Sequence, residues 1–348
     1  MHSFISNSNT RIPDLNYRKI AFFTIAILTL TLIVSEIFFR KRGFQTNITD
    51  STMYWGLKRK EVYKNNHWDK IVIVGASRAQ LGIVPKTIED ELTHYKAIHL
   101  TIDGTSYFYV LKDLCEDVKF NGVIFFSVTA GDFKQRLFEK AKPWVDYYHK
   151  NVDGISEIGN KLNTIIQVNI QDNFVITSSA LNIRRIIYSR LSPKPLYSRM
   201  QKDRYRPAFF YERLTPDKLS KHRKHRIEKI VNKFEKTNDN FESKKKEFKK
   251  AMKELRNYYV ILKSRGGDLI LIRMPTTDEH WSVDEINYPK QIFWDQITKL
   301  TGIPTVHFKD YASLNSFDCP DTSHLDATDS PQFTKSLVSI IKNKIGIP

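Results

Sequence analysis

Cysteine is rare in this chain: Cys115 and Cys319 are the two found in 348 residues. Two cysteines are too few for a disulfide scaffold, and they lack the close spacing of a zinc site, so cysteine usage does not reveal the compartment. Glycine and proline are also sparse, at 13 residues each, which excludes a collagen-like chain. A hydrophobic share of 41% excludes wholesale disorder, and the composition is that of a globular protein.

Acidic residues are outnumbered by basic ones. Against 38 Asp and Glu stand 55 Lys and Arg, which gives a formal charge of +17. Such a charge attracts any large anionic surface, which leaves membrane phospholipid, nucleic acid and an acidic envelope polymer as candidate partners. No nucleic-acid-binding motif accompanies the basic residues, so we do not predict a nucleic acid partner.

The basic charge is concentrated in the middle of the chain. Residues 200–258 hold 19 Lys or Arg and 9 Asp or Glu, a net charge of +10. We interpret the segment at about 137–257 as a helical basic insertion whose charged face is solvated. An alternative interpretation is a basic arm that lies against anionic lipid or polymer.

Charge is almost absent from one stretch near the N-terminus. In the twenty residues Ile20–Phe39, Glu36 is the only charged residue. At about 1.5 Å per residue, this run is long enough to span a hydrocarbon core. No site of small residues for signal cleavage follows it, which predicts an uncleaved transmembrane anchor. Residues 1–19 then form an N-terminal tail and residues 40–68 a juxtamembrane linker.

The orientation of this anchor is weakly constrained. Basic residues flank both ends of the run, and their count slightly favours a cytoplasmic C-terminal side. Long domains, however, translocate with little regard to flanking charge, so the sequence leaves the topology open.

β-branched runs alternate with helical spacing beyond residue 69. The predicted strands are 70–74, 97–102, 122–128, 268–273 and 303–308, and the predicted helices are 87–92, 107–118, 243–265 and 330–343. Continuous apolar runs are typical of strands buried on both faces. The alternation predicts an α/β domain over 69–348, with a parallel sheet covered by helices on both faces.

A candidate nucleophile follows the first predicted strand, in Gly75-Ala76-Ser77-Arg78. Ligands of open parallel sheets bind beyond the carboxyl ends of the strands, which is where Ser77 would present its hydroxyl. The small residues before it allow a sharp turn, and a following helix would direct its first amides at an oxyanion. The alternative is that Ser77 only caps a helix.

A candidate base and its partner lie near the other end of the chain, in Asp321-Thr322-Ser323-His324-Leu325. An Asp and a His three residues apart share one face of a turn. The carboxylate can then hold one imidazole nitrogen while the other nitrogen faces a serine. The alternative is that Asp321 caps a turn and His324 is an ordinary surface histidine.

Together and in this order, the two motifs resemble the SGNH (GDSL-like) hydrolase and acyltransferase superfamily, over about 70–120 and 266–345. The resemblance implies an SGNH-type three-layer sandwich. It also implies Ser77 as nucleophile, His324 as general base and Asp321 as the residue that orients it. Gly104, after the second strand, lies where the family offers a backbone amide to the oxyanion.

The chain departs from the family at the third block, where an Asn side chain is usual. The sequence after the third strand contains Ser127 and Thr129 instead, so one of these, or backbone amides alone, would complete the oxyanion hole. Divergent third blocks are familiar in membrane-anchored branches similar to teichoic-acid D-alanyl transfer and alginate acetylation proteins. Arg273 resembles a residue that borders the site in those branches, and Arg78 adjoins the nucleophile. Each could steady an anion or form a plain salt bridge.

The resemblance implies a serine acyltransferase that moves an acyl group, with acetyl the expected one, onto a cell-envelope polysaccharide outside the cytoplasmic membrane. It also implies a multispan membrane partner that donates the acyl group. The alternatives are an SGNH-type esterase and a non-catalytic scaffold or glycan-binding protein. We predict no cofactor and no metal, because the histidines do not fall into ligand spacings: His99, His149, His222, His225 and His280.

A dehydrogenase is a different possible class, because Val74-Gly75-Ala76-Ser77-Arg78 is also similar to the start of short-chain dehydrogenases. The further glycines needed near a pyrophosphate are missing. Tyr259 and Lys263 have the Tyr-x-x-x-Lys spacing of that family, but lysine is common throughout this stretch, and coincidence explains the pair better.

Overall fold

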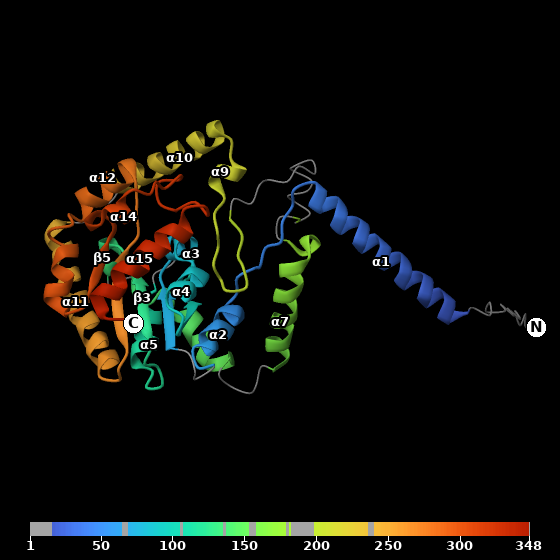
Figure 1. The fold of residues 1–348 in the computed structure, drawn as a ribbon, viewed down its shortest axis with the longest axis horizontal. Coiled ribbons are helices and arrows are strands. Elements are labelled where there is room, and N and C mark those ends of the chain that lie inside the picture. Colours follow the sequence, from blue (N-terminus) through green and yellow to red (C-terminus); the bar gives the residue numbers. More distant parts are fainter. Residues whose placement is uncertain are drawn as a thin grey trace, which may run out of the picture.

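The structure is a computed structural model that describes residues 16–64, 69–104, 107–134, 137–152, 158–178, 181, 198–235 and 240–347. Most of the predicted N-terminal tail lies outside these residues. The described part consists of a folded α/β body and one long helix, α1 (Tyr17–Lys41), that stands away from it (Figure 1).

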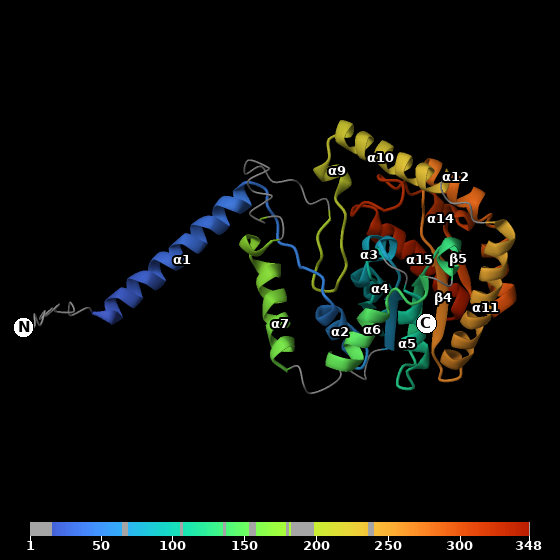
Figure 2. The same cartoon turned by 180° about the vertical axis from the view of Figure 1, so that it is seen from behind.

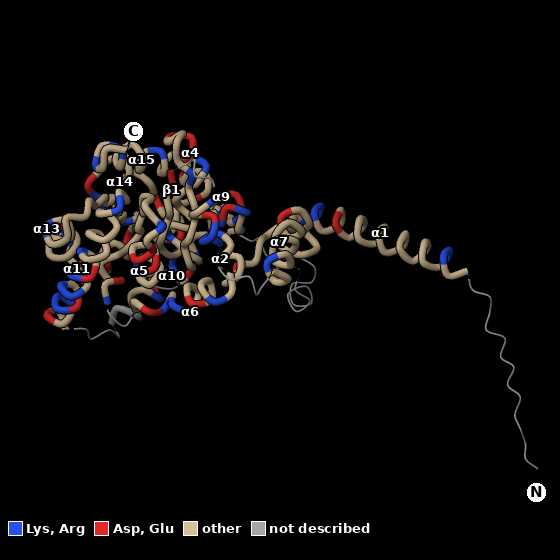
Figure 3. The backbone as a smooth tube through the Cα atoms, turned by 90° about the horizontal axis from the view of Figure 1, so that it is seen from below, with Lys and Arg blue, Asp and Glu red and all other residues tan. Residues whose placement is uncertain are grey.

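Helix α1 contains the predicted apolar run. Among the described residues, α1 is the one helix that is long enough and apolar enough to cross a membrane. Its mean hydropathy is 2.3, and none of its residues is buried. Figure 3 shows that charged residues gather on the folded body, whereas α1 carries them only near its two ends. Only the C-terminal end of α1 contacts the rest of the chain, where Glu36 and Arg40 bind residues 173–176. An apolar helix that is otherwise exposed suits a lipid environment better than water.

The body is built on a sheet of five parallel strands in the order β2-β1-β3-β4-β5. The strands are β1 (Asp69–Val74), β2 (Tyr95–His99), β3 (Val123–Ser127), β4 (Asp268–Arg273) and β5 (Thr305–His307). This confirms the predicted α/β class and the five strands. The second strand ends earlier than predicted, although the amide of Leu100 still donates to Ile73 and that of Ile102 to Gly75.

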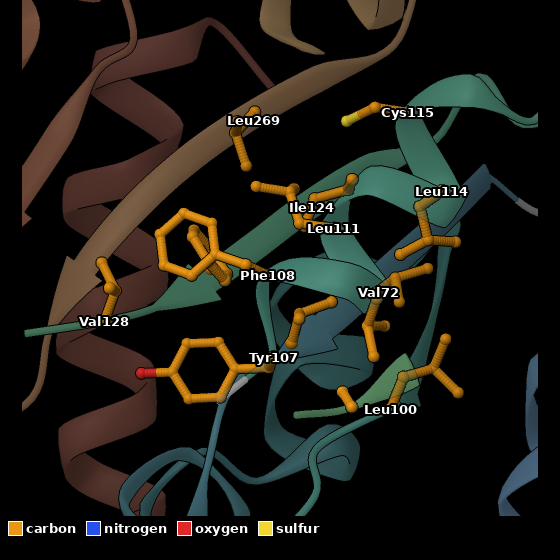
Figure 4. Close-up of a cluster of buried hydrophobic side chains, with 14 of the residues drawn as sticks. Val72, Leu100, Tyr107, Phe108, Leu111, Leu114, Cys115, Ile124, Val128 and Leu269 are labelled. Carbon is orange, nitrogen blue, oxygen red and sulfur yellow. The ribbon is translucent and has the colours of Figure 1, made fainter. Parts of the chain in front are cut away.

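Helices cover both faces of the sheet. One face packs against α2 (Thr52–Glu61), α5 (Phe108–Glu116) and α11 (Phe241–Lys263). The other packs against α3 (Ser77–Gly82), α4 (Pro85–Glu91), α14 (Ala312–Asn315) and α15 (Ser330–Ile345). Successive strand residues alternate between these faces, so that Val72 belongs to the first core and Ile73 to the second. Figure 4 shows the first core, where Ile124 and Leu269 of the sheet meet Phe108 of α5.

One segment outside the predicted sheet elements belongs to the core, and one predicted helix overlaps the predicted insertion. Helix α2 lies within the predicted linker, yet Trp55 and Arg59 are fully buried, and Arg59 pairs with Asp113 at 2.9 Å and Asp117 at 2.8 Å. Helix α11 matches the predicted helix 243–265, although it begins within the predicted insertion, and its apolar stripe, which includes Phe248 and Leu255, packs on the sheet. Burial of an apolar stripe, and not charge density, decides where the sheet domain begins.

The rest of the insertion is helical where the structure describes it. Its helices include α6 (Lys142–Tyr147), α7 (Ile158–Asn173), α9 (Phe210–Arg213) and α10 (Pro216–Glu235). In Figures 1 and 2, α10 lies across the upper end of the body, and α7 lies between the body and α1. Helix α10 packs on α12 (Asp278–Asn287), which follows β4.

Candidate active site

Ser77 is the first residue of α3 and follows the carboxyl end of β1. The turn before it brings two strands close together: a Cβ atom on Gly75 would lie 3.0 Å from the Cβ of Ser127 and 3.1 Å from that of Ala79. A side chain at position 75 would therefore force these neighbours apart. Because β1 lies between β2 and β3, the site is at the point where the strand order reverses, and a crevice forms there in open α/β sheets.

Ser77, His324 and Asp321, the three predicted catalytic residues, form a continuous chain of hydrogen bonds. Ser77 Oγ is 2.8 Å from His324 Nε2, and His324 Nδ1 is 2.8 Å from Asp321 Oδ2. The second carboxylate oxygen of Asp321 accepts from the backbone amides of Ser323 (3.1 Å) and His324 (2.9 Å). Those two bonds fix the turn that presents the imidazole, so the structure brings the sequence-predicted residues together at one place.

The ionisation of Asp321 suits the role of orienting a base. Its side chain is 4% exposed, and burial alone would raise its pKa. The hydrogen bond and charge of His324, and the charge of Arg226, outweigh burial and hold the pKa of Asp321 well below its ordinary value. The ionised Asp321 accepts a hydrogen bond from the protonated Nδ1 of His324, which leaves the Nε2 lone pair facing the Ser77 hydroxyl.

Ser77 is half-buried and opens into a cavity of about 370 Å³. Helix α10 of the basic insertion contributes to its wall: Arg226 Nη2 donates to Ser323 Oγ at 2.6 Å and lies 3.7 Å from Asp321. Sequence reasoning missed Arg226, because nothing distinguishes it from the many other basic residues of its helix. Other lining residues that were missed are Tyr107, Asp132 and Arg206.

Gly104 and Thr129, the predicted oxyanion residues, both line this cavity. Gly104 has a φ of +69°, a left-handed conformation that favours glycine. Both donors of Thr129 are already used, however: its amide and its hydroxyl each donate to Asp132 Oδ2 at 2.8 Å, as does the hydroxyl of Tyr107. The predicted use of Thr129 as a side-chain oxyanion donor therefore does not match its contacts, because a carboxylate three residues later holds its hydroxyl.

Arg78 lies beside the nucleophile but makes its contact elsewhere. Its Nη2 is 3.1 Å from His280 Nε2, and His280 Nδ1 is 3.1 Å from the Thr322 hydroxyl, next to Asp321. Burial, together with the charge of Arg78, lowers the pKa of His280 to about 3, so this imidazole is neutral and accepts from the guanidinium. Arg78 thus connects α3 to the turn that carries Asp321.

Arg273 forms a buried salt bridge, the structural alternative considered for it. It is 4% exposed, and its Nη2 donates to Asp284 at 2.5 Å and to Thr276 at 3.1 Å. It lines a neighbouring cavity of about 600 Å³ and not the wall around Ser77. The two cavities share Arg78, Gly104 and other lining residues, so they are adjacent.

No protein-family model and no curated protein matches this chain.

The Tyr-x-x-x-Lys pair lies far from Ser77 in the sheet. The Tyr259 hydroxyl (3.3 Å) and Lys263 Nζ (2.5 Å) both contact Asp268, the first residue of β4, at the amino end of the strand. Ser77 is at the opposite, carboxyl edge of the parallel sheet, so no dehydrogenase constellation forms. Within the described ranges, no group of three or more His, Cys, Asp or Glu side chains could hold a metal ion.

Proposed function

We propose that this chain is a membrane-anchored serine acyltransferase of SGNH type. The observation that carries the proposal is the Ser77–His324–Asp321 chain, with 2.8 Å at each contact, at the carboxyl edge of the sheet and open to a cavity. A serine buried under the insertion would favour a non-catalytic scaffold, whereas the half-buried Ser77 supports catalysis.

Acylation starts when a donor ester or thioester binds against Ser77. His324 Nε2 takes the Ser77 proton while Oγ attacks the acyl carbon, and Asp321 stabilises the imidazolium that forms. The amides of Ser77 and Gly104 face the developing oxyanion. The intermediate collapses to acyl-Ser77, and His324 gives the proton to the leaving group.

Transfer reverses these roles with a different partner. An acceptor hydroxyl loses its proton to His324 Nε2 and attacks the acyl carbon of acyl-Ser77. The Ser77–acyl bond breaks, and the proton returns to Ser77 Oγ. If water attacks in place of the acceptor, the same residues perform the esterase reaction, which is the second candidate function.

A cell-envelope polysaccharide as the acceptor and acetyl as the acyl group are supported by the resemblance to envelope acyltransferases. Arg78, Arg206 and Arg226 line the cavity together with Asp103 and Asp132, and Arg206 pairs with Asp103 at 2.7 Å. The wall therefore offers hydrogen-bond partners to a hydroxyl-rich chain. Helix α1 would anchor the domain on the outer side of the cytoplasmic membrane, with residues 1–19 in the cytoplasm. The anchor would also place the domain beside a multispan partner that supplies the acyl group.

The test compares full-length protein with its Ser77→Ala variant in native membranes. We expect a covalent acyl adduct on the wild-type peptide that contains Ser77 and acylated envelope glycan, both lost in the variant. Ser282→Ala, which removes an exposed hydroxyl on α12, serves as the control and should behave as wild type. Unchanged glycan acylation in Ser77→Ala would refute transfer through this serine, and free acid without acylated glycan would indicate the esterase.

A further inference from the structure

Helix α7 has its apolar face turned outward. Val168 is its one buried residue among those described, while five aliphatic side chains are 40–58% exposed: Ile158, Leu162, Ile165, Ile166 and Ile170. Their spacing of three to four residues places them on one face of the helix. A helix on a water-facing surface has the opposite arrangement, with its apolar stripe toward the core.

The other face of α7 rests on the body through mostly polar contacts. Gln171 accepts a hydrogen bond of 2.9 Å from the amide of Thr49, and Val168 joins a small cluster with Tyr54 and Met200. The helix is thus held in place with its apolar stripe directed away from the protein.

Polar side chains on the outward face are turned back onto the helix itself. The side-chain amide of Asn169 donates to the backbone carbonyl of Ile165, and the side-chain amide of Asn173 donates to the backbone carbonyl of Asn169, both at 2.8 Å. Charge is scarce along the helix, with Lys161 and Asp172 as its two charged residues. Donors that are satisfied internally make this face easier to place in a medium poor in hydrogen-bond partners.

The C-terminal end of α7 is fastened to the end of the apolar helix α1. Glu36 accepts from the backbone amides of Val175 (2.9 Å) and Ile176 (3.0 Å), and Arg40 donates to the Asn173 carbonyl at 2.7 Å. Val175 also packs in a cluster with Phe39 and Phe44. Figures 1 and 2 show α7 and α1 coming together near the C-terminal end of α1.

We propose that α7 lies in the bilayer interface, with its aliphatic stripe in the lipid of the leaflet from which the C-terminal end of α1 emerges. The occupant of the stripe is lipid because α7 ends against the membrane span: the contacts of Glu36 and Arg40 hold the end of α7 at the level of the last turns of α1. Exposed Phe174 lies at that junction. This inference rests on α1 as the membrane anchor.

Attachment through both α1 and α7 restricts how the folded body can turn relative to the membrane. A single helix leaves a domain free to turn about its anchor, whereas α1 and α7 together hold one side of the body against the membrane. The orientation of the Ser77 cavity relative to the bilayer is then restricted.

The test uses full-length protein in vesicles of phosphatidylcholine and phosphatidylglycerol that contain no other protein. An environment-sensitive fluorophore is attached in turn to Ile166→Cys, on the stripe, and to Gln167→Cys, the exposed neighbour on another face. Both native cysteines are buried, so unsubstituted protein measures background labelling. Lipids that carry a nitroxide in the upper acyl chain should quench the Ile166→Cys fluorophore several-fold more than the Gln167→Cys fluorophore.

Other outcomes overturn the proposal. Equal quenching at the two positions means that the stripe is not in lipid. Rapid disulfide cross-linking between copies of Ile166→Cys, without lipid quenching, assigns the stripe to a second copy. If the label is not quenched in vesicles and is shielded from solvent only in native membranes, the stripe binds a protein partner. Failure of the chain to float with the vesicles refutes the anchor as well, while glycan acylation through Ser77 is measured separately.

Discussion

Arg226 on α10 donates a 2.6 Å hydrogen bond to Ser323, the residue directly before His324 in the turn that carries Asp321. The basic insertion therefore reaches the candidate catalytic residues and is more than a solvated surface. Its neighbour Arg223 pairs with Asp278 and Asp318, which ties α10 down over the same edge of the sheet.

Arg226 should act as a positioning residue. Hydrogen bonds to charged groups contribute about 1.5–3 kcal/mol, and less where the side chain is partly exposed; the Arg226 side chain is 33% exposed. We expect Arg226→Gln to slow labelling of Ser77 by a fluorophosphonate probe by roughly tenfold, which corresponds to about 1.4 kcal/mol. Lys224→Gln, an exposed change on the same helix, should leave the rate unaltered. Equal rates in both variants would show that Arg226 has no influence on the nucleophile.

Replacing Asp321 by Asn should nearly abolish activation of Ser77 while keeping the turn. Asn retains an acceptor for the Ser323 and His324 amides but no longer favours a proton on His324 Nδ1. Loss of the correct tautomer reduces turnover about 10⁴-fold in serine hydrolases, and we expect a loss of that order in probe labelling. Asp310→Asn, which removes a half-exposed carboxylate outside the cavity, is the control. Labelling of Asp321→Asn within tenfold of wild type would argue against the orienting role.

Gly75 should be intolerant of any side chain. A Cβ at this position would lie 3.0 Å from the Ser127 Cβ and 3.1 Å from the Ser127 carbonyl oxygen. We expect Gly75→Ala to lower the free energy of unfolding by about 1–3 kcal/mol and to slow Ser77 labelling, because β1 and β3 must separate. The measurement is thermal unfolding in detergent together with probe labelling.

The double variant Gly75→Ala/Ser127→Gly distinguishes this clash from a general effect. Removing the Ser127 Cβ eliminates the closest contact, so part of the stability should return. A double variant less stable than Gly75→Ala alone would show that close approach to Ser127 is not the cause.

Buried His99 should make the body sensitive to acid. Burial lowers its pKa to about 3, and its Nε2 is 2.8 Å from the Ile83 carbonyl. Between pH 3 and the ordinary value of about 6.5, the unfolded chain binds a proton at this residue and the folded chain does not. Stability contributed by neutral His99 is thus present above pH 6.5 and falls as the pH drops, by about 2 kcal/mol at pH 5.

Thermal unfolding at pH 7 and pH 5 checks this pH dependence. His99→Gln should be less stable than wild type at pH 7, because the hydrogen bond between the imidazole and the Ile83 carbonyl is lost. Its stability should, however, fall less between the two pH values. An identical pH dependence in the variant would rule out His99 as a source of acid sensitivity.

Much of the fold could be predicted from the chain alone. Short β-branched runs such as the one ending at Val74 are typical of buried parallel strands, because β-branched side chains favour the extended backbone and a strand covered on both faces is apolar throughout. The limits of the sheet domain could not be predicted in the same way. Trp55 lies in a segment whose composition suggests a linker, and only the tertiary packing of α2 gives this residue a core.

Some residues of the candidate site could likewise be predicted from the sequence, and others could not. Ser77, Asp321 and His324 were predictable because each occupies a short local pattern: a turn after a strand, or a carboxylate three residues before an imidazole. Arg226 and His280 were not, since their partners in the site are specified by how α10 and α12 pack against the turn that carries Asp321. Thr129 was assigned a role from its position, but its hydroxyl is held by Asp132.

The sequence by itself determined the apolar span of α1, the parallel α/β class and the three residues of the proposed chemistry, because these depend on local periodicity and spacing. Tertiary structure alone decided that Ser77 and His324, 247 positions apart, approach to 2.8 Å, and that α7 turns its aliphatic side chains outward beside α1. Distances between remote residues follow from which faces pack together, and packing is a property of the whole folded chain.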